Sequence, residues 1–365
     1  MTYTFVKRDT STAVNKLTFH ITLRVYRDLF SANGTGLDAN APIAILSQTA
    51  NGSYTLYNQR SIALKSKSNV APPVLPCSEV PPNLGTEEGI YEWDEVLNES
   101  PRSYVITYQR CCRNNTIGNI LNPGTTGSTY TVEISAESQR TNNNSPAFSN
   151  FPPTLICGNE PLIFDHSAAD TEGDQLVYSF CNALVGGSSG GSPGPSPTGT
   201  SIGKPPYQFV TYKLPNFSFN SPVSGSPAIK IDPNTGLITG TPNALGQYVV
   251  TVCVDEYRSG VLIGKIFRDF QFNVVSCKRL VVTAIAADST MGKTFFISGC
   301  ENVTATIINT SYDRRNINSF YWDFYMRNDT VRYTDWSPTV TFRDTGVFKG
   351  ILKLNPGTQC KIRLL

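Results

Sequence analysis

Residues 165–181 read DHSAADTEGDQLVYSFC, and this stretch determines the expected fold. It joins an acidic turn to an alternating run, and alternation of apolar and polar side chains is typical of a half-buried β-strand. A related pattern lies downstream, where residues 238–242 (ITGTP) indicate a hairpin and residues 246–256 (GQYVVTVCVDE) indicate a long strand ending in acids. Together the two stretches predict one β-sandwich module.

The composition extends that prediction to all 365 residues. Only 16% of them are charged, while 28 glycines and 24 prolines supply frequent turns, and this favours many short strands over helices. The 30 lysines and arginines nearly balance the 28 acidic residues, without a basic stripe, so nucleic acid is not an expected partner. No run approaches the roughly 20 apolar residues of a membrane-spanning helix, so no membrane span is expected.

We expect an all-β chain of tandem β-sandwich domains. The first occupies residues 1–143 and contains a strictly alternating strand at residues 17–25. Residues 142–146 (NNNSP) form a polar linker, after which the second domain occupies residues 144–278. The third domain, residues 279–365, carries a strongly aromatic strand.

The cysteines predict disulfides in an oxidising compartment, because they are scattered and lack the C-x-x-C spacing of a zinc site. All nine are candidate disulfide residues: Cys77, Cys111, Cys112, Cys157, Cys181, Cys253, Cys277, Cys300 and Cys360. Their odd number leaves at least one without a partner inside the chain.

Neighbouring cysteines bridge each other only with strain, so Cys111 and Cys112 are expected to take separate partners. Cys77 is the expected partner of one, and the other is either a free thiol or bonded to Cys157.

Four further cysteines of the second domain allow three connectivities. We favour a bond between Cys181 and Cys253, which leaves Cys157 for Cys277. In the third domain, Cys300 and Cys360 lie near opposite ends of the sequence. A bond between them would restrict the unfolded chain by roughly 4 kcal/mol in the entropy model.

Several of these stretches resemble large surface proteins that the type IX secretion system of gliding bacteria exports. The matching stretches are residues 108–114 (YQRCCRN), 144–146, 165–178 and 238–256. Residues 145–277 are similar to cadherin-like and immunoglobulin-like modules. Residues 280–365 resemble a polycystic-kidney-disease (PKD) domain through Trp322-Asp323-Phe324, although Tyr325 and its successors replace the usual Gly-Asp-Gly turn.

The resemblance implies a non-enzymatic segment of a secreted protein on the outer cell surface, used in adhesion or gliding motility as a disulfide-stapled structural and binding array. Expected partners are cell-surface or secretion-system proteins, glycans or abiotic surfaces. Two alternatives remain open: a carbohydrate-binding accessory region of a secreted hydrolase, and a surface filament or scaffold subunit. Since no sorting domain follows Leu365, we expect the chain to be one piece of a larger protein.

The acidic turn holds candidate calcium ligands. Asp170, Glu172 and Asp174 alternate along the loop, and such spacing lets several oxygens converge on Ca²⁺, which takes six to eight oxygen ligands. Asp255 and Glu256 end a strand that could reach the same edge. These five carboxylates are the candidate ligands, and calcium is the one expected cofactor. The alternative is a solvated turn whose aspartates hydrogen-bond to nearby backbone.

No catalytic residues are expected. The chain has only two histidines, and a strand pattern places His20 on a polar sheet face. A glycosidase would need two carboxyls roughly 5 to 10 Å apart across an aromatic-lined cleft. The three tryptophans, Trp93, Trp322 and Trp336, fit sandwich cores at least as well as a sugar platform.

Overall fold

The computed structural model is all-β, which confirms the predicted fold class. It describes residues 1–29, 36–71, 78–79, 85–187, 195–196, 203–279, 281–291, 294–299, 304–312, 314–357 and 362–364. Helical structure in these ranges is confined to one α-helix and two 3₁₀ turns: α1 (Ala136–Thr141), η1 (Pro123–Thr125) and η3 (Arg314–Asn316).

The chain divides into two compact units. Unit 1 comprises Met1–Pro73 and Pro82–Ser276, and unit 2 comprises Val74–Pro81 and Cys277–Leu365. The division at Ser276 lies close to the expected boundary after residue 278. The expected boundary between residues 143 and 144 is wrong, because both sides of it belong to unit 1.

One sheet of unit 1 contains four antiparallel strands in the order β1–β2–β7–β5. Their bounds are β1 (Thr2–Asp9), β2 (Lys16–Asp28), β7 (Thr86–Asn98) and β5 (Ser66–Val70). The predicted alternation at residues 17–25 is present in β2, where Leu17, Phe19 and Ile21 are fully buried. This face packs into the core of unit 1.

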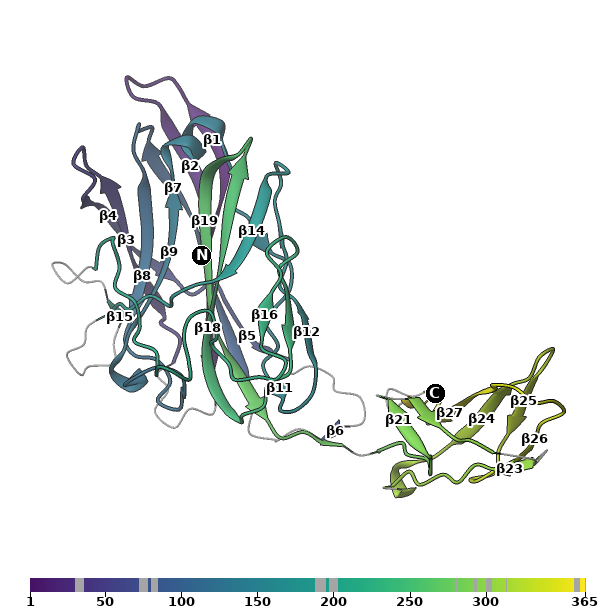
Figure 1. The fold of residues 1–365 in the computed structure, drawn as a ribbon. Helices are drawn as coiled ribbons and strands as arrows, with labels where there is room; N and C mark the ends of the chain where they lie inside the picture. Colours follow the sequence, from purple (N-terminus) through teal and green to yellow (C-terminus); the bar gives the residue numbers. More distant parts are fainter. Residues whose placement is uncertain are drawn as a thin grey trace. The chain divides into compact units, whose positions relative to one another are not determined.

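The larger sheet runs across the expected domain boundary (Figure 1). Its strand order is β14–β18–β19–β9–β8–β3–β4, and β11 and β15 attach to β19 and β8. The bounds are β14 (Gln175–Phe180), β18 (Gly246–Arg258), β19 (Val261–Val275), β9 (Ser128–Ile134), β8 (Tyr104–Arg110), β3 (Asn40–Gln48), β4 (Tyr54–Ala63), β11 (Ile156–Cys157) and β15 (Pro195–Ser196). Strands from both expected modules therefore share one sheet.

The long strand predicted at residues 246–256 is β18, and it forms an antiparallel hairpin with β19. Ser259 and Gly260 both adopt positive φ, 51° and 80°, which is the backbone required by a tight turn that matches the strand twist. Strand β19 then meets β9, where Ile266 pairs with Val132. This pairing joins the hairpin to strands from the first expected domain.

Two small sheets complete unit 1. Strand β17 (Leu237–Gly240) pairs with β12 (Leu162–Asp165) and β16 (Lys230–Ile231), and β10 (Ala147–Phe148) pairs with β13 (Ala168–Ala169). Buried Phe164 and Ile238 of the first small sheet belong to the same hydrophobic core as Ile21 of β2. A single core thus extends through the whole unit.

The polar run that was expected to be a linker is built into this interior. Asn143 is fully buried and Ser145 is 7% exposed. The Ser145 hydroxyl accepts a hydrogen bond from the Tyr3 backbone N–H at 2.8 Å. Buried polar groups are tolerated where their hydrogen bonds are made, so a polar run need not lie at the surface. The linker interpretation failed for this reason.

Unit 2 has its own core around the aromatic strand β24 (Phe320–Tyr325). Trp322 and Leu352 are buried there, at 2% and 1% exposure. The sheet order is β25–β24–β27–β28, and three further strand pairs belong to unit 2: β21–β22, β23–β26 and β6–β20. The bounds are β25 (Thr330–Tyr333), β27 (Lys349–Leu354), β28 (Ile362–Leu364), β21 (Ser289–Met291), β22 (Thr294–Phe296), β23 (Thr304–Thr306), β26 (Thr339–Thr341), β6 (Ser78–Glu79) and β20 (Lys278–Arg279).

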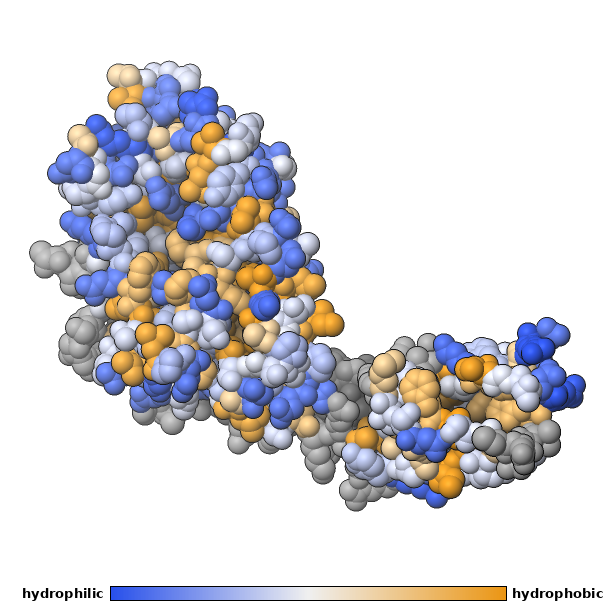
Figure 2. Space-filling view, viewed as in Figure 1, coloured by the Kyte–Doolittle hydropathy of each residue, from blue (hydrophilic) through white to orange (hydrophobic). Residues whose placement is uncertain are grey.

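The described part of the chain holds no helix of the length and apolarity needed to cross a bilayer. On the face shown in Figure 2, apolar residues are interspersed with polar ones.

Candidate functional site

The acidic turn brings three of the five candidate calcium ligands together. Asp170, Asp174 and Glu256 each place one carboxylate oxygen within 4.8 Å of the others. Antiparallel pairing explains the meeting, because Leu176 at the start of β14 lies opposite Glu256 near the end of β18. The end of β18 therefore lies beside the turn that precedes β14.

The other two candidates lie apart from this acidic cluster. Glu172 is exposed, and its carboxylate accepts hydrogen bonds from Asn144 and Thr171. Asp255 precedes Glu256 in β18, and successive strand residues point to opposite faces of a sheet. The Asp255 carboxylate lies 3.0 Å from the Lys265 ammonium.

Within the cluster, Asp170 shapes the turn. Its Oδ1 accepts hydrogen bonds from the backbone N–H groups of Glu172 and Asp174, at 3.1 and 2.8 Å. This is the local bonding expected for an aspartate-led turn. Its Oδ2 is buried and has no hydrogen-bond partner among the described residues. Asp174 is paired at two points with the Arg258 guanidinium.

Glu256 is fully buried. Its Oε1 accepts a hydrogen bond from Asn143 Nδ2 at 2.7 Å, whereas its Oε2 has no partner in the described ranges. Burial raises the pKa of Glu256 to about 8, and the charges of Asp170 and Asp174 act in the same direction. The cluster thus presents buried carboxylate oxygens that a proton or a hard cation would satisfy.

Glycine at position 264 leaves room for the Glu256 carboxylate. A Cβ there would lie 2.4 Å from Glu256 Oε2, closer than non-bonded atoms approach. Three side-chain oxygens are fewer than the six to eight ligands of Ca²⁺, so water or backbone oxygens would complete the shell. With that completion, the donor set fits a hard cation.

A second candidate site is a pocket of about 460 Å³ in unit 1. No role was predicted for most of its residues. Its walls come from four stretches of sequence that lie far apart: residues 25–28, 110–117, 151–154 and 269–271, with further contributions from residues 86, 124–125, 128, 130, 249 and 273.

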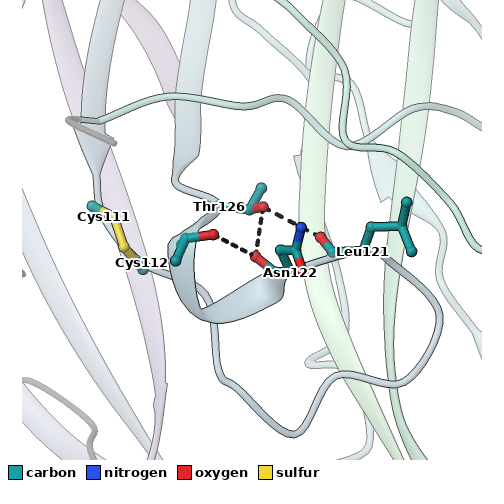
Figure 3. Close-up of a disulfide and its surroundings, with 6 residues drawn as sticks. Cys111, Cys112, Leu121, Asn122 and Thr126 are labelled. Carbon is teal, nitrogen blue, oxygen red and sulfur yellow. Dashed lines mark hydrogen bonds between the residues drawn. A yellow bond between two sulfur atoms is a disulfide. The ribbon is translucent and has the colours of Figure 1, made fainter. Parts of the chain in front are cut away.

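One wall is a disulfide between the adjacent residues Cys111 and Cys112 (Figure 3). The expectation that each would take a separate partner is wrong. The peptide bond between them is cis, and their Cα atoms are 3.0 Å apart, so the two side chains leave the backbone close together. The next residue, Arg113, donates its backbone N–H to Thr126 at 2.9 Å, which ties the disulfide to the neighbouring turn.

A network of ion pairs holds the pocket's arginines. The Arg113 side chain is 6% exposed and bonds both carboxylate oxygens of Asp269. Arg110 donates to the Gly36 carbonyl at 2.6 Å and lies 3.6 Å from Asp38. In the described part of the chain, Arg113 Nε is buried without an acceptor.

Arg27 is the third arginine of the pocket. Its Nε is likewise buried, lacks a hydrogen-bond acceptor in the ranges given above, and lies 3.7 Å from the Glu87 carboxylate. The arginines of the pocket are therefore fixed cations that already have acidic neighbours.

Amides and aromatic rings form further parts of the lining. Asn114 donates to Asp28 Oδ2 at 3.1 Å, and Asn273 donates to the Thr154 carbonyl at 2.7 Å. The rings of Tyr26 and Phe151 meet edge to face, with centroids 4.5 Å apart. A useful sequence signal was present in YQRCCRN, where paired cysteines lie between two arginines.

The two histidines occupy contrasting positions. On the sheet surface, His20 Nδ1 lies 2.8 Å from Asp94 Oδ1. His166 is fully buried among Phe148, Phe164 and Phe270, and its ring nitrogens have no partner among the described residues. Burial lowers the pKa of His166 to about 3, so this side chain is neutral at ordinary pH.

The remaining cysteines extend the disulfide framework. Cys181 and Cys253 are bonded, the pairing favoured from the sequence. Cys157 and Cys277 are each disulfide-bonded as well. Cys77, Cys300 and Cys360 lie outside the described residues, so the pairings expected for them stay predictions.

No family model, curated protein or solved structure matches this chain. The function must therefore be argued from the geometry of the acidic cluster and the pocket.

Proposed function

We propose that the chain is a non-enzymatic segment of a secreted protein on the outer cell surface, where it acts in adhesion or gliding motility as a disulfide-stapled binding array. The resemblance to surface proteins exported by the type IX secretion system belongs to this proposal, with unit 2 as the PKD-like part. Partners in this proposal are cell-surface or secretion-system proteins, glycans or abiotic surfaces.

The observation that carries the proposal is the preformed pocket. Its volume of about 460 Å³ lies within the usual range of ligand sites. Because the Cys111–Cys112 bond and the Arg113–Asp269 ion pair fix its walls, a ligand need not order them on binding. The disulfides also favour a secreted location, since structural disulfides persist in oxidising compartments.

His166 is not suited to general-base catalysis. A general base for chemistry near neutral pH needs a pKa near that pH and access to the substrate. His166 has neither, since burial both encloses it and lowers its pKa to about 3.

In this proposal, calcium has a structural role in the protein. Asp170, Asp174 and Glu256 would hold the ion, and its charge would displace the proton that burial favours on Glu256. The role of the ion would be to fasten the turn before β14 to the end of β18.

The test is retention of beads coated with the full chain on defined surfaces under flow. The surfaces are glass, polystyrene and immobilised polysaccharides, with albumin-coated beads as the control. Adhesion requires retention well above albumin on at least one surface. Retention no higher than that of albumin-coated beads on every surface would refute the proposal. Release of sugar products from the polysaccharides would refute its non-enzymatic part.

A further inference from the structure

We infer that the pocket beside the Cys111–Cys112 disulfide binds a sugar ring of a glycan. This inference deepens the proposed adhesive function and rests on it. It assigns the ligand class and gives the disulfide the role of an apolar platform.

The pocket has two kinds of wall, and they match the two kinds of surface on a sugar ring. A sugar ring presents an apolar face of C–H groups and an edge of hydroxyl groups. The pocket offers the disulfide and the ring of Tyr26 as apolar surfaces, and sulfur is polarisable and makes favourable dispersion contacts. Amide and guanidinium groups, including those of Asn115 and Arg113, line other parts of the same pocket.

The charges that line the pocket suit a neutral sugar better than an anion. Each of the three arginines already has an acidic neighbour: Asp269 for Arg113, Asp38 for Arg110 and Glu87 for Arg27. Asp28 adds a further carboxylate to the wall. A phosphate or sulfate would therefore meet cations whose charge is largely balanced, whereas hydroxyl groups can both donate to the carboxylates and accept from the arginines.

The pocket's arginines are also held in place before any ligand binds. The Arg113 guanidinium bonds both carboxylate oxygens of Asp269, and Arg110 donates to the Gly36 carbonyl. Because these contacts fix the guanidinium planes, the arginines need little ordering when hydroxyl groups bind beside them.

The test combines a glycan array with titration calorimetry on the full chain. The wild type should bind a group of neutral glycans. The double variant Cys111→Ala/Cys112→Ala should bind the best of them about tenfold more weakly. Asn115→Ala should also weaken binding, because Asn115 is an exposed wall residue. Asn69→Ala is the matched control, since Asn69 is exposed on β5 outside the pocket, and it should bind like the wild type. Melting curves must show that all variants are folded.

Three results would overturn the inference: no glycan bound by the wild type, binding only to free phosphate or sulfated glycans, or equal affinity in the wild type and both folded pocket variants. The bead assay separates this failure from failure of the proposed function. Beads that adhere without any glycan affinity leave adhesion standing and remove the sugar site. If the chain binds glycans but its beads never adhere, the sugar site stands and the adhesive function is removed.

Discussion

Arg113 and Asp269, 156 positions apart in the sequence, form a two-point ion pair inside unit 1. The pair joins the loop after β8 to the middle of β19, across the position where a domain boundary was expected. Both side chains are largely buried, at 6% and 11% exposure. The contact therefore belongs to the interior of one folded unit.

Removing one partner of this pair should be strongly destabilising. Asp269→Asn leaves a buried guanidinium uncompensated, and we expect a loss of about 3–5 kcal/mol in the free energy of unfolding. Asp255→Asn is the matched control, because its partner Lys265 is 42% exposed, and it should cost about 1 kcal/mol or less. Urea unfolding measures both. Equal losses of unfolding free energy in the two variants would contradict a buried ion pair between Arg113 and Asp269.

Calcium should raise the melting temperature. At a calcium concentration 100-fold above Kd, linkage gives about 2.7 kcal/mol, or a rise of roughly 5 °C in Tm. Asp170→Ala should abolish the rise, and Asp335→Ala, an exposed aspartate of unit 2, should keep it. A wild type whose Tm is unchanged in millimolar calcium would remove the site.

Glu256→Gln should stabilise the metal-free protein at neutral pH. The folded-state pKa of about 8 exceeds the ordinary value of 4.5, so folding favours the protonated carboxyl. The resulting stability is fully present below pH 4.5 and is lost as the pH rises towards 8, by about 3 kcal/mol at pH 7. The amide cannot ionise, so its variant should lack this loss. Urea unfolding in EDTA at pH 5, 7 and 8 measures the free energy of unfolding of both proteins. The same pH dependence in Glu256→Gln and the wild type would contradict the prediction.

His166 should make the fold sensitive to acid. Its folded-state pKa of about 3 lies below the ordinary 6.5, so folding favours the neutral ring. That stability is present above pH 6.5 and falls as the pH drops towards 3, by about 2 kcal/mol at pH 5. His166→Phe should remove this part of the acid sensitivity. His20→Gln is the control, and both are compared with the wild type by unfolding at pH 7.5 and pH 5. An unaltered pH dependence in His166→Phe would refute the assignment.

The elements that the sequence predicted well are those with local patterns. The alternation of β2 and the turn at Asp170–Asp174 depend on residues close in sequence, and both are present. The strand that follows the turn also brings Cys181 diagonally across from its partner, because Ser179, two positions before Cys181, pairs with Cys253 in the β14–β18 ladder.

The elements that were missed depend on distant residues. Asn143 lies in a run typical of a linker, and only the fold reveals its buried bond to Glu256. The pocket draws its walls from stretches that range from residue 25 to residue 273, so no window of sequence contains it. Its disulfide was missed because the usual distance between bonded cysteines argues against adjacent partners.

The large sheet and single core of unit 1 also bear on how the chain carries load. Two separate sandwiches would yield one after the other, each releasing its own length of chain. In unit 1, β8, β9, β18 and β19 are hydrogen-bonded into one sheet over one core. Unit 1 under tension should therefore unfold in a single rupture, so that up to its breaking force this unit behaves as one stiff link.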